Sequence, residues 1–284
     1  APGIIWQPRP DVTLMTFPGV PAEVKQMWRE VAVPYLKQAG WVQKTVLRRM
    51  LKFWGISESA LAEKVSSYFN LQNPTVAPYA NLGEVKLRIA ALADSEAIAC
   101  SMIEPIETQL REIGGEDCYG ADDDSLATVV GELLLKTGGT LSVAESCTGG
   151  GLGAMITGVS GSSSYFMGGI TSYDNAVKVG LLGVNSKDLE TDGAVSSVVA
   201  EQMAVGVRDR LKTDWGLSIT GIAGPSGGTD EKPVGLVYIG LAGKDSVTAF
   251  EHRFGAARGR DWVRHLSACS ALDHLRRALI KITL

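Results

Sequence analysis

The sequence predicts an α/β fold, in which a three-layer α/β/α C-terminal domain is preceded by a small α+β unit and the tail of a truncated α/β domain. Three observations support this prediction. Strand-like and helix-like segments alternate after about residue 125, an acidic stretch punctuated by glycine precedes them, and 284 residues exceed the usual size of one core. We therefore expect four parts, which are residues 1–38, residues 39–114, a linker at 115–124, and the large domain at 125–284.

The first part has two short strands and a helix. Residues 4–7 and 12–17 have the apolar and β-branched composition of strands, and a turn at 18–21 follows them. A helix should come next, with Pro34 fraying or bending its end. Its apolar face consists of Val24, Met27, Trp28, Val31 and Tyr35. This is too little for a domain, and because the chain opens without methionine we expect a fragment of a longer protein.

The middle part reads as a small α+β unit. Its strand candidates are residues 45–53 and 85–91, and its helix candidates are residues 57–69 and 95–113. The stretch 115–124 that follows has glycine and acidic residues without periodicity, which is typical of a linker. We place the main domain boundary there.

The C-terminal part begins with a helix and then alternates strands and helices. Apolar residues at 126–134 recur at helical spacing, with Asp124 or Ser125 as the cap and Gly138 near the end. Later strand candidates are residues 140–144, 169–173, 217–223, 234–241 and 247–254, and later helix candidates are residues 198–211 and 260–282. Such alternation favours helices on both faces of one sheet.

Composition and charge argue against several classes of function. The net charge is -4 and Lys and Arg are not clustered, which argues against binding to nucleic acid or to an anionic membrane. The four cysteines form no C-x-x-C pair and there are only three histidines, so neither a disulfide framework nor a zinc site is indicated. The sequence has no run of about 18 apolar residues and no signal peptide, so we expect a cytoplasmic protein.

The segment 144–151 follows a predicted strand and contains three glycines. Its backbone N–H groups could bind an anion at the start of a helix. The alternative is a tight turn that needs glycine only for its backbone conformation. The residues alone support both interpretations equally.

A serine cluster and a lysine suggest nucleophilic catalysis. Residues 161–166 hold three consecutive serines, and Lys178 follows them along the chain. A serine hydroxyl needs a neighbouring base, and a lysine amine can act as that base when burial lowers its pKa. The competing interpretation is that the serines form a loop and that Lys178 is solvated.

Two further segments offer polar groups at strand ends. Residues 218–225 run from a strand into a glycine turn that residues 227–235 continue, so a hydroxyl and backbone amides there suit an oxyanion or a phosphate. Arg258 follows the last strand and could clamp a phosphate. The alternatives are a long surface connection and a solvated arginine.

Taken together, these motifs resemble the C-terminal domain of the CinA family, also called PncC. The matching segments are residues 144–150, 161–166, 173–178, 193–196, 220–225 and 232–235, in the family's order and spacing over about 160 residues. The resemblance implies hydrolysis of the carboxamide of nicotinamide mononucleotide, which gives nicotinic acid mononucleotide and ammonia in pyridine-nucleotide salvage. It implies no metal and no organic cofactor.

The resemblance also implies roles for individual residues. Ser163, the second of the three serines, would be the nucleophile, and Lys178 would be its base. Tyr173 and Thr220 would support the site, and Arg258 would contact the substrate phosphate. Further substrate contacts would come from Glu145, Ser146, Thr148, Gly149, Gly150, Gly221 and Gly224.

Two rival interpretations accompany these assignments. Cys147 is a rival nucleophile, but no histidine lies in an obvious partner motif, so we expect it to pack beneath the turn. A non-catalytic nucleotide-binding or regulatory module, concerned with competence or DNA damage as the family's name suggests, is the rival function. Such a module would need phosphate contacts but neither a nucleophile nor a base.

The resemblance extends to the earlier parts of the chain. Residues 17–21 look like a turn of the molybdopterin-binding-like domain that precedes this region in full-length CinA. Only the tail of that domain is present, so we expect the chain to lack the ADP-ribose pyrophosphatase activity associated with it. The middle part looks like the family's KH-type connector, and because it has no G-x-x-G loop we do not expect RNA binding. The resemblance also implies a homodimer.

Overall fold

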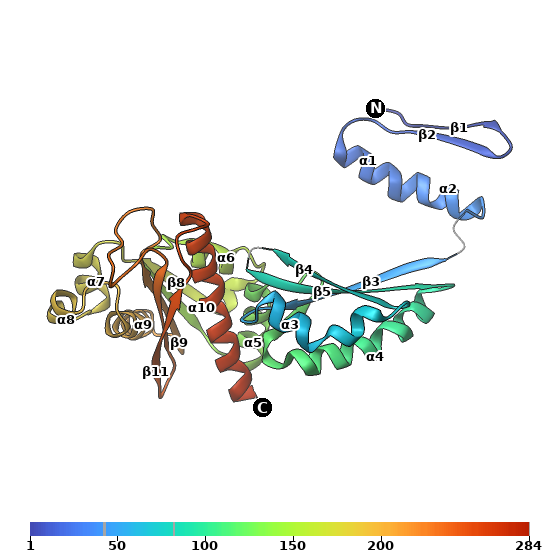
Figure 1. Cartoon of the computed structure of the whole chain (residues 1–284). Coiled ribbons are helices and arrows are strands. Elements are labelled where there is room, and N and C mark those ends of the chain that lie inside the picture. Colours follow the sequence, from blue (N-terminus) through green and yellow to red (C-terminus); the bar gives the residue numbers. More distant parts are fainter. Residues whose placement is uncertain (42–43, 82, 284) are drawn as a thin grey trace. The chain divides into compact units, whose positions relative to one another are not determined.

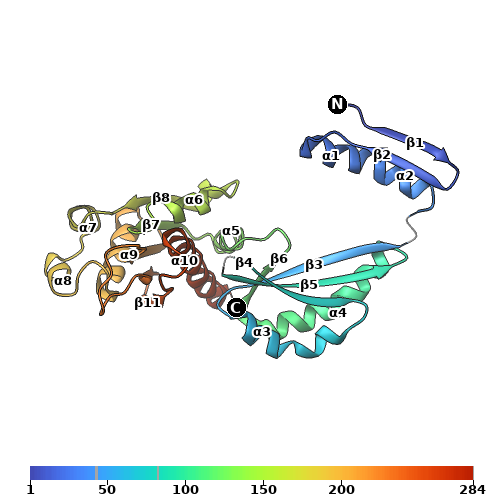
Figure 2. The same ribbon diagram turned by 45° about the horizontal axis from the view of Figure 1, so that its top comes forward.

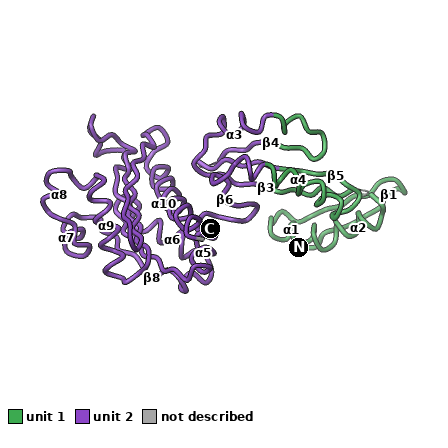
Figure 3. Tube along the Cα trace, turned by 90° about the horizontal axis from the view of Figure 1, so that it is seen from below, with its two compact units in different colours: residues 1–49, 67–76, 89–109 green, residues 50–66, 77–88, 110–284 purple. Residues whose placement is uncertain are grey.

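The computed structural model of the chain describes residues 1–41, 44–81 and 83–283. The chain divides into two compact units (Figure 3). Unit 1 comprises residues 1–49, 67–76 and 89–109, and unit 2 comprises residues 50–66, 77–88 and 110–284.

Unit 1 begins with the predicted strands and helix. Strands β1 (Ile4–Arg9) and β2 (Val12–Thr16) pair as an antiparallel hairpin. The helical segment that follows consists of α1 (Pro21–Met27), the π-helical turn η1 (Trp28–Ala32) and α2 (Val33–Gln38) (Figure 1). Pro34 does not end the helix, because the wider turn of η1 precedes it and accommodates the missing N–H.

A four-stranded sheet has the strand order β4-β5-β3-β6. Its strands are β3 (Thr45–Phe53), β4 (Thr75–Asn81), β5 (Glu84–Ala93) and β6 (Cys118–Ala121). The helices of this region are α3 (Glu58–Lys64), the short η2 (Ser66–Asn70) and α4 (Glu96–Gly114). The structure confirms β3, β5 and both predicted helices. Strand β4 is not among the predictions, because Pro78 interrupts its strand-like composition.

Residues 115–124 are not the irregular linker that their composition predicts. They contain η3 (Gly115–Asp117) and strand β6, whose Ala121 lies opposite Leu51 of β3. Tyr119 is 7% exposed and belongs to the hydrophobic core. A four-residue strand between acidic and glycine residues is too short to show alternation, so its pairing partner decides its structure.

The C-terminal part of unit 2 contains a five-stranded sheet with the order β11-β10-β9-β7-β8. Its strands are β7 (Leu141–Glu145), β8 (Phe166–Thr171), β9 (Trp215–Gly221), β10 (Leu236–Ala242) and β11 (Val247–Arg253). Strand β7 is parallel to both of its neighbours, whereas β10 is antiparallel to β9 and β11. The carboxyl ends of β7, β8 and β9 therefore lie at one edge of the sheet.

Helices cover both faces of this sheet, which confirms the predicted three-layer arrangement (Figures 1 and 2). One layer contains α5 (Leu126–Thr137), α6 (Gly151–Thr157) and α10 (Arg260–Thr283). The other contains α7 (Asn175–Leu182), α8 (Ser186–Thr191) and α9 (Ser197–Leu211). Three of these helices, α6, α7 and α8, are absent from the predictions because helices of eight residues or fewer carry too little periodicity to recognise.

Local signals set the ends of α5 as predicted. The Ser125 hydroxyl accepts the N–H of Thr128, and the Thr128 hydroxyl accepts the N–H of Ser125, so a capping box starts the helix. Gly138 ends it with φ of 66°, a conformation that glycine adopts without strain.

A pair of histidines is partly buried between β11 and α10. Their Nε2 atoms are 2.9 Å apart, and the His274 ring stacks on Phe250 with centroids 3.7 Å apart. Burial, aided by the nearby His252 and Arg277, lowers the pKa of His274 to about 3. Burial also lowers the pKa of His252. Both rings are therefore neutral in the folded protein at neutral pH.

We predict that the folded state loses stability as pH falls below about 6.5, the ordinary histidine pKa. Between that pH and the lowered pKa values the unfolded chain binds more protons than the folded chain, so each histidine lowers the free energy of unfolding by at most about 1.4 kcal/mol per pH unit. Urea unfolding at pH 7.5 and 5.5 measures this loss. His274→Phe should lose less unfolding free energy between these two pH values than the parent. An equal loss in the variant and the parent would contradict the role given to the buried histidines.

Candidate active site

A cavity of about 340 Å³ lies at the carboxyl ends of β7 and β9. Several of the predicted site residues line it together, although they come from distant parts of the sequence. These residues are Ser146, Tyr173, Lys178, Thr220, Gly221 and Gly224. Asn175 and Arg260, which are not among the predicted site residues, also line it.

Lys178 is the chemically distinctive residue of this cavity. It is 1% exposed, and its Nζ donates hydrogen bonds to the carbonyl oxygens of Ser172 at 2.8 Å and Tyr173 at 3.2 Å. Nζ also contacts the Ser146 Oγ at 3.5 Å. Burial lowers the pKa of the Lys178 amine, although the nearby Asp174 carboxylate opposes this shift. A lowered pKa favours the neutral form of the amine, which Ser–Lys chemistry requires beside the serine hydroxyl.

The sheet places this serine and lysine together. Ser146 is the first residue after β7, and its N–H donates to the Ile219 carbonyl of β9. On the other side of β7, the Ser172 N–H donates to the Glu145 carbonyl. Asp174 then caps α7 by accepting the N–H of Ala176, which directs the first turn of the helix and Lys178 back toward the cavity.

Glu145, a predicted substrate contact, does not line the cavity and instead accepts backbone hydrogen bonds. Its side chain is buried, and its carboxylate accepts the N–H groups of Gly150 and Leu152 at 3.0 Å and of Gly153 at 2.8 Å. These amides at the start of α6 are therefore not available to an anionic ligand. Gly149 and Gly150 have φ of 58° and 94°, so the tight-turn interpretation of this segment is the correct one.

Thr148 does not line the cavity either. Its side chain is buried, and its carbonyl accepts the Arg264 Nη2 at 2.8 Å. Cys147 is 5% exposed and packs in the hydrophobic core, as predicted. Burial raises the pKa of its thiol to about 11, so the thiolate that a nucleophile needs is scarce at neutral pH.

Ser163 does not lie beside Lys178, so the structure does not bring the predicted pair together. Ser163 is exposed in the short η4 helix (Ser162–Ser164), which precedes β8, whereas Lys178 follows β8. Strand β8 has six residues, and a strand rises about 3.3 Å per residue, so roughly 20 Å separates the two sites. The serine that does contact Lys178 is 32 positions away in the sequence, at Ser146.

Arg258 is also replaced by a neighbour. Its guanidinium lies 4.4 Å from the centroid of the Trp262 ring and does not line the cavity. Arg260 does, and it donates to the Gly224 carbonyl at 2.8 Å and the Tyr173 hydroxyl at 3.3 Å. Arg260 differs from Arg258 in that it is the first residue of α10, and the start of this helix lies at the cavity.

Thr220, Gly221 and Gly224 shape the walls of the cavity. The buried Thr220 Oγ1 donates to the Ala194 carbonyl at 2.6 Å. A side chain at Gly221 would come within 2.6 Å of Val237, and Gly224 has φ of 81°. These three residues therefore fix the positions of the strand and loop segments that line the cavity.

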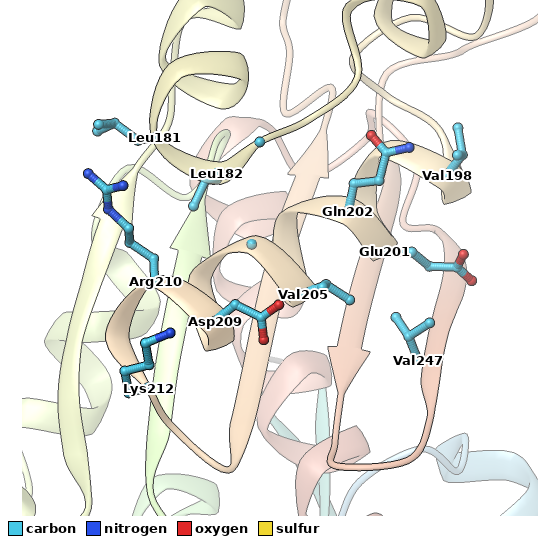
Figure 4. A pocket seen from close by; sticks show the side chains of 12 residues that line it. Leu181, Leu182, Val198, Glu201, Gln202, Val205, Asp209, Arg210, Lys212 and Val247 are labelled. Carbon is cyan, nitrogen blue, oxygen red and sulfur yellow. The ribbon is translucent and has the colours of Figure 1, made fainter.

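A larger groove of about 940 Å³ runs along the outer side of α9 (Figure 4). Its described lining includes Glu201, Asp209, Arg210 and Lys212 but no serine, threonine or cysteine. Since it offers no nucleophile, we place the candidate active site in the smaller cavity.

No three or more His, Cys, Asp or Glu side chains among residues 1–41, 44–81 and 83–283 are grouped so that they could hold a metal ion. In the same part of the chain, no helix combines the length and apolar character needed to cross a bilayer.

Two family models match the chain. The one described as "CinA C-terminal domain" matches residues 123–279, and the one described as "Damage-inducible protein CinA KH domain" matches residues 48–120. All the residues that line the candidate active site fall within the first match.

Similar proteins bear related names. A CinA-like protein of Nostoc punctiforme is 66% identical over 281 residues, which are 99% of this chain and 68% of the relative. A CinA-like protein of Synechococcus elongatus is 64% identical over 283 residues, or 100% of this chain and 67% of the relative.

Solved structures of two bacterial proteins resemble the C-terminal domain. The competence/damage inducible protein CihA of Agrobacterium tumefaciens is 39% identical with a TM-score of 0.53, covering 55% of this chain and 93% of its own. A CinA superfamily protein of Escherichia coli is 29% identical with a TM-score of 0.51, covering 55% of this chain and 92% of its own.

We predict that Glu145→Gln lowers the free energy of unfolding by about 1–3 kcal/mol, because a charged acceptor of three hydrogen bonds is replaced by a neutral amide with only one acceptor oxygen. Urea unfolding measures the loss. Glu190→Gln, at an exposed position of α8, is the matched control and should change little. Equal stability of the two variants would contradict the role assigned to Glu145.

Proposed function

The chain belongs to the CinA family, and on that premise we propose that it is an amidohydrolase that converts nicotinamide mononucleotide into nicotinic acid mononucleotide and ammonia. In this proposal Ser146 is the nucleophile and Lys178 is its base. One observation carries it: the buried Lys178 amine lies 3.5 Å from the Ser146 hydroxyl in a cavity large enough for a small ligand.

The proposed reaction has two steps, which are formation of an ester to Ser146 and hydrolysis of that ester. The neutral Lys178 amine accepts the Ser146 proton as Oγ attacks the carboxamide carbon. The C–N bond breaks, and Lys178 passes that proton to the leaving nitrogen, so ammonia departs and an ester to Ser146 remains. A water molecule gives a proton to Lys178 and attacks the ester. The Oγ–C bond then breaks, Ser146 regains a proton from Lys178, and the acid is released.

The residue after Ser146 supplies a candidate donor for the oxyanion. Cys147 lines the cavity, and its backbone N–H follows directly after Ser146 in the chain. A backbone N–H next to the nucleophile is well placed to stabilise negative charge on the substrate oxygen. The buried Glu145 carboxylate supports this role by holding the following turn through Gly150, Leu152 and Gly153.

Arg260 supports the choice of a phosphorylated substrate. It brings a permanent positive charge to the cavity, and its contacts with the Gly224 carbonyl and the Tyr173 hydroxyl orient the guanidinium. A planar guanidinium binds phosphate oxygens through paired hydrogen bonds. We therefore assign to Arg260 the phosphate contact that the resemblance implies.

A non-catalytic nucleotide-binding module is the competing function. Such a module would use Arg260 to hold an anion, but it would gain nothing from a buried lysine that contacts a serine hydroxyl. Burying a lysine costs free energy. The position of Lys178 beside Ser146 therefore favours the enzyme.

We predict that Ser146→Ala and Lys178→Met each reduce ammonia release from nicotinamide mononucleotide at least about 1,000-fold, because each removes half of the nucleophilic pair. Ser163→Ala is the matched control and should retain the parental rate, with EDTA present throughout. Loss of activity only in Ser163→Ala would overturn the assignment. Nucleotide binding without ammonia release by the parent would favour the binding module.

We predict a pH dependence that follows Lys178. The base must be neutral, so kcat/KM should fall tenfold per pH unit below the pKa of this amine and level off above it. Because burial lowers that pKa, the inflection should lie below about 10.4, the ordinary value for lysine. A pH profile of kcat/KM measures it. An inflection at or above the ordinary value would contradict the role of Lys178.

We also propose the homodimer that the resemblance implies, with the α9 groove as its interface. Leu181 and Val247 lie at this groove (Figure 4). Their exposed fractions are 44% and 41%. The groove also carries two acidic and two basic side chains, so it can complement a second copy of itself.

Leu181→Glu should lower the mass in light scattering from twice 30.1 kDa to 30.1 kDa, whereas Leu135→Glu, at an exposed position of α5, should not. A monomeric parent would overturn the proposal.

A further inference from the structure

The connection between β9 and β10 is longer than the sheet requires. Antiparallel neighbours can be joined by about two residues, but these strands are joined by residues 222–235. Two hydrogen bonds close the base of this loop, from the Ile222 N–H to the Leu236 carbonyl at 2.9 Å and from the Gly235 N–H to the Ile222 carbonyl at 2.7 Å. The first half of the loop, including Gly224 and Gly227, lines the candidate active site.

The opposite wall is the segment 192–196, between α8 and α9. Ala194 and Val195 of this segment line the same cavity. The Thr220 hydroxyl holds the segment from the sheet side by donating to the Ala194 carbonyl. The Thr220 contact comes from β9, so the side of the segment 192–196 that faces away from the sheet is held by other residues.

Lys232 holds that side of the segment from the far half of the loop. A turn presents it, since the Lys232 N–H donates to the Thr229 hydroxyl at 3.0 Å and the Thr229 N–H donates to the Lys232 carbonyl at 2.9 Å. Its Nζ then donates to the Val195 carbonyl at 2.8 Å and to the Asp192 carbonyl. Gly193 leaves room for the amine, because a Cβ there would be 3.2 Å from Nζ.

We propose that Lys232 is a positioning residue that clasps the 222–235 loop to the 192–196 segment and so sets the width of the cavity for its ligand. It contacts no group of the nucleophilic pair: its side-chain acceptors among the described residues are the two carbonyls of the opposite wall. The ammonium group suits this task because it has three donors and can serve both carbonyls at once. The proposed effect on catalysis rests on the proposed function, whereas the clasp itself does not.

Protease accessibility tests the clasp without reference to activity. Glutamyl endopeptidase should cut after Glu231 at least about tenfold faster in Lys232→Met than in the parent, because local opening exposes the loop. Lys187→Met, at an exposed position of α8, is the matched control and should be cut at the parental rate. Lys232→Arg, which retains donors and charge, should restore at least part of the protection. Parental cutting of Lys232→Met would overturn the proposal.

Steady-state kinetics tests the consequence for the substrate. Lys232→Met should raise KM for nicotinamide mononucleotide about tenfold while kcat changes less than about twofold, as expected when binding is lost without damage to the chemistry. Circular dichroism and the melting temperature check that each variant is folded. A fall in kcat with unchanged KM would overturn the positioning role. If the parent releases no ammonia, the proposed function fails while the cutting rates still decide whether Lys232 is a clasp.

Discussion

The burial of the Lys178 amine is the constraint on which the candidate site depends. An ammonium group removed from water is costly unless it finds acceptors or gives up its proton. Here the acceptors are two carbonyls just beyond the end of β8, and the same burial lowers the pKa of the amine. The amine can therefore be neutral at a lower pH than an exposed lysine, and the Ser146 hydroxyl is the nucleophilic group in contact with it.

A second buried ionisable group lies on the other side of Ser146. The Glu145 carboxylate accepts three N–H groups at the start of α6, which compensates its burial and orients the turn that contains Cys147 and Thr148. The two buried groups differ in their contacts. The carboxylate is fully satisfied and makes the turn rigid, whereas the amine keeps a contact with a reactive hydroxyl.

The walls of the cavity come from segments outside the regular core. The segment 192–196 is held to β9 through Thr220 and to the loop 222–235 through Lys232, while Arg260 reaches the cavity from the start of α10. Loops on a rigid scaffold often carry binding groups because their shape can be set with little effect on the core. Ser146 therefore lies at a strand end, whereas Ala194, Val195 and Gly227 line the same cavity from loops.

The predictions made from sequence succeed where the determining interactions are local. Alternation of strands and helices, the Ser125 cap, the Gly138 terminus and the packing of Cys147 follow from residue types and short-range spacing. The strands β4 and β6 escape prediction because proline in one and the shortness of the other hide the pattern, so pairing decides them.

The candidate site also combines features that local sequence predicts with features that depend on contacts between distant segments. The sequence by itself determined that a lysine and a serine on an α/β scaffold are candidates for a nucleophilic pair, and it identified Lys178 among them. Only the tertiary structure decided that the serine in contact with Lys178 is Ser146 rather than Ser163, that Arg260 rather than Arg258 lines the cavity, and that Glu145 accepts three backbone N–H groups. The physical reason is the strand order: β7 lies between β8 and β9, so residues at their carboxyl ends meet across long sequence separations, while a residue before β8 lies at the opposite edge.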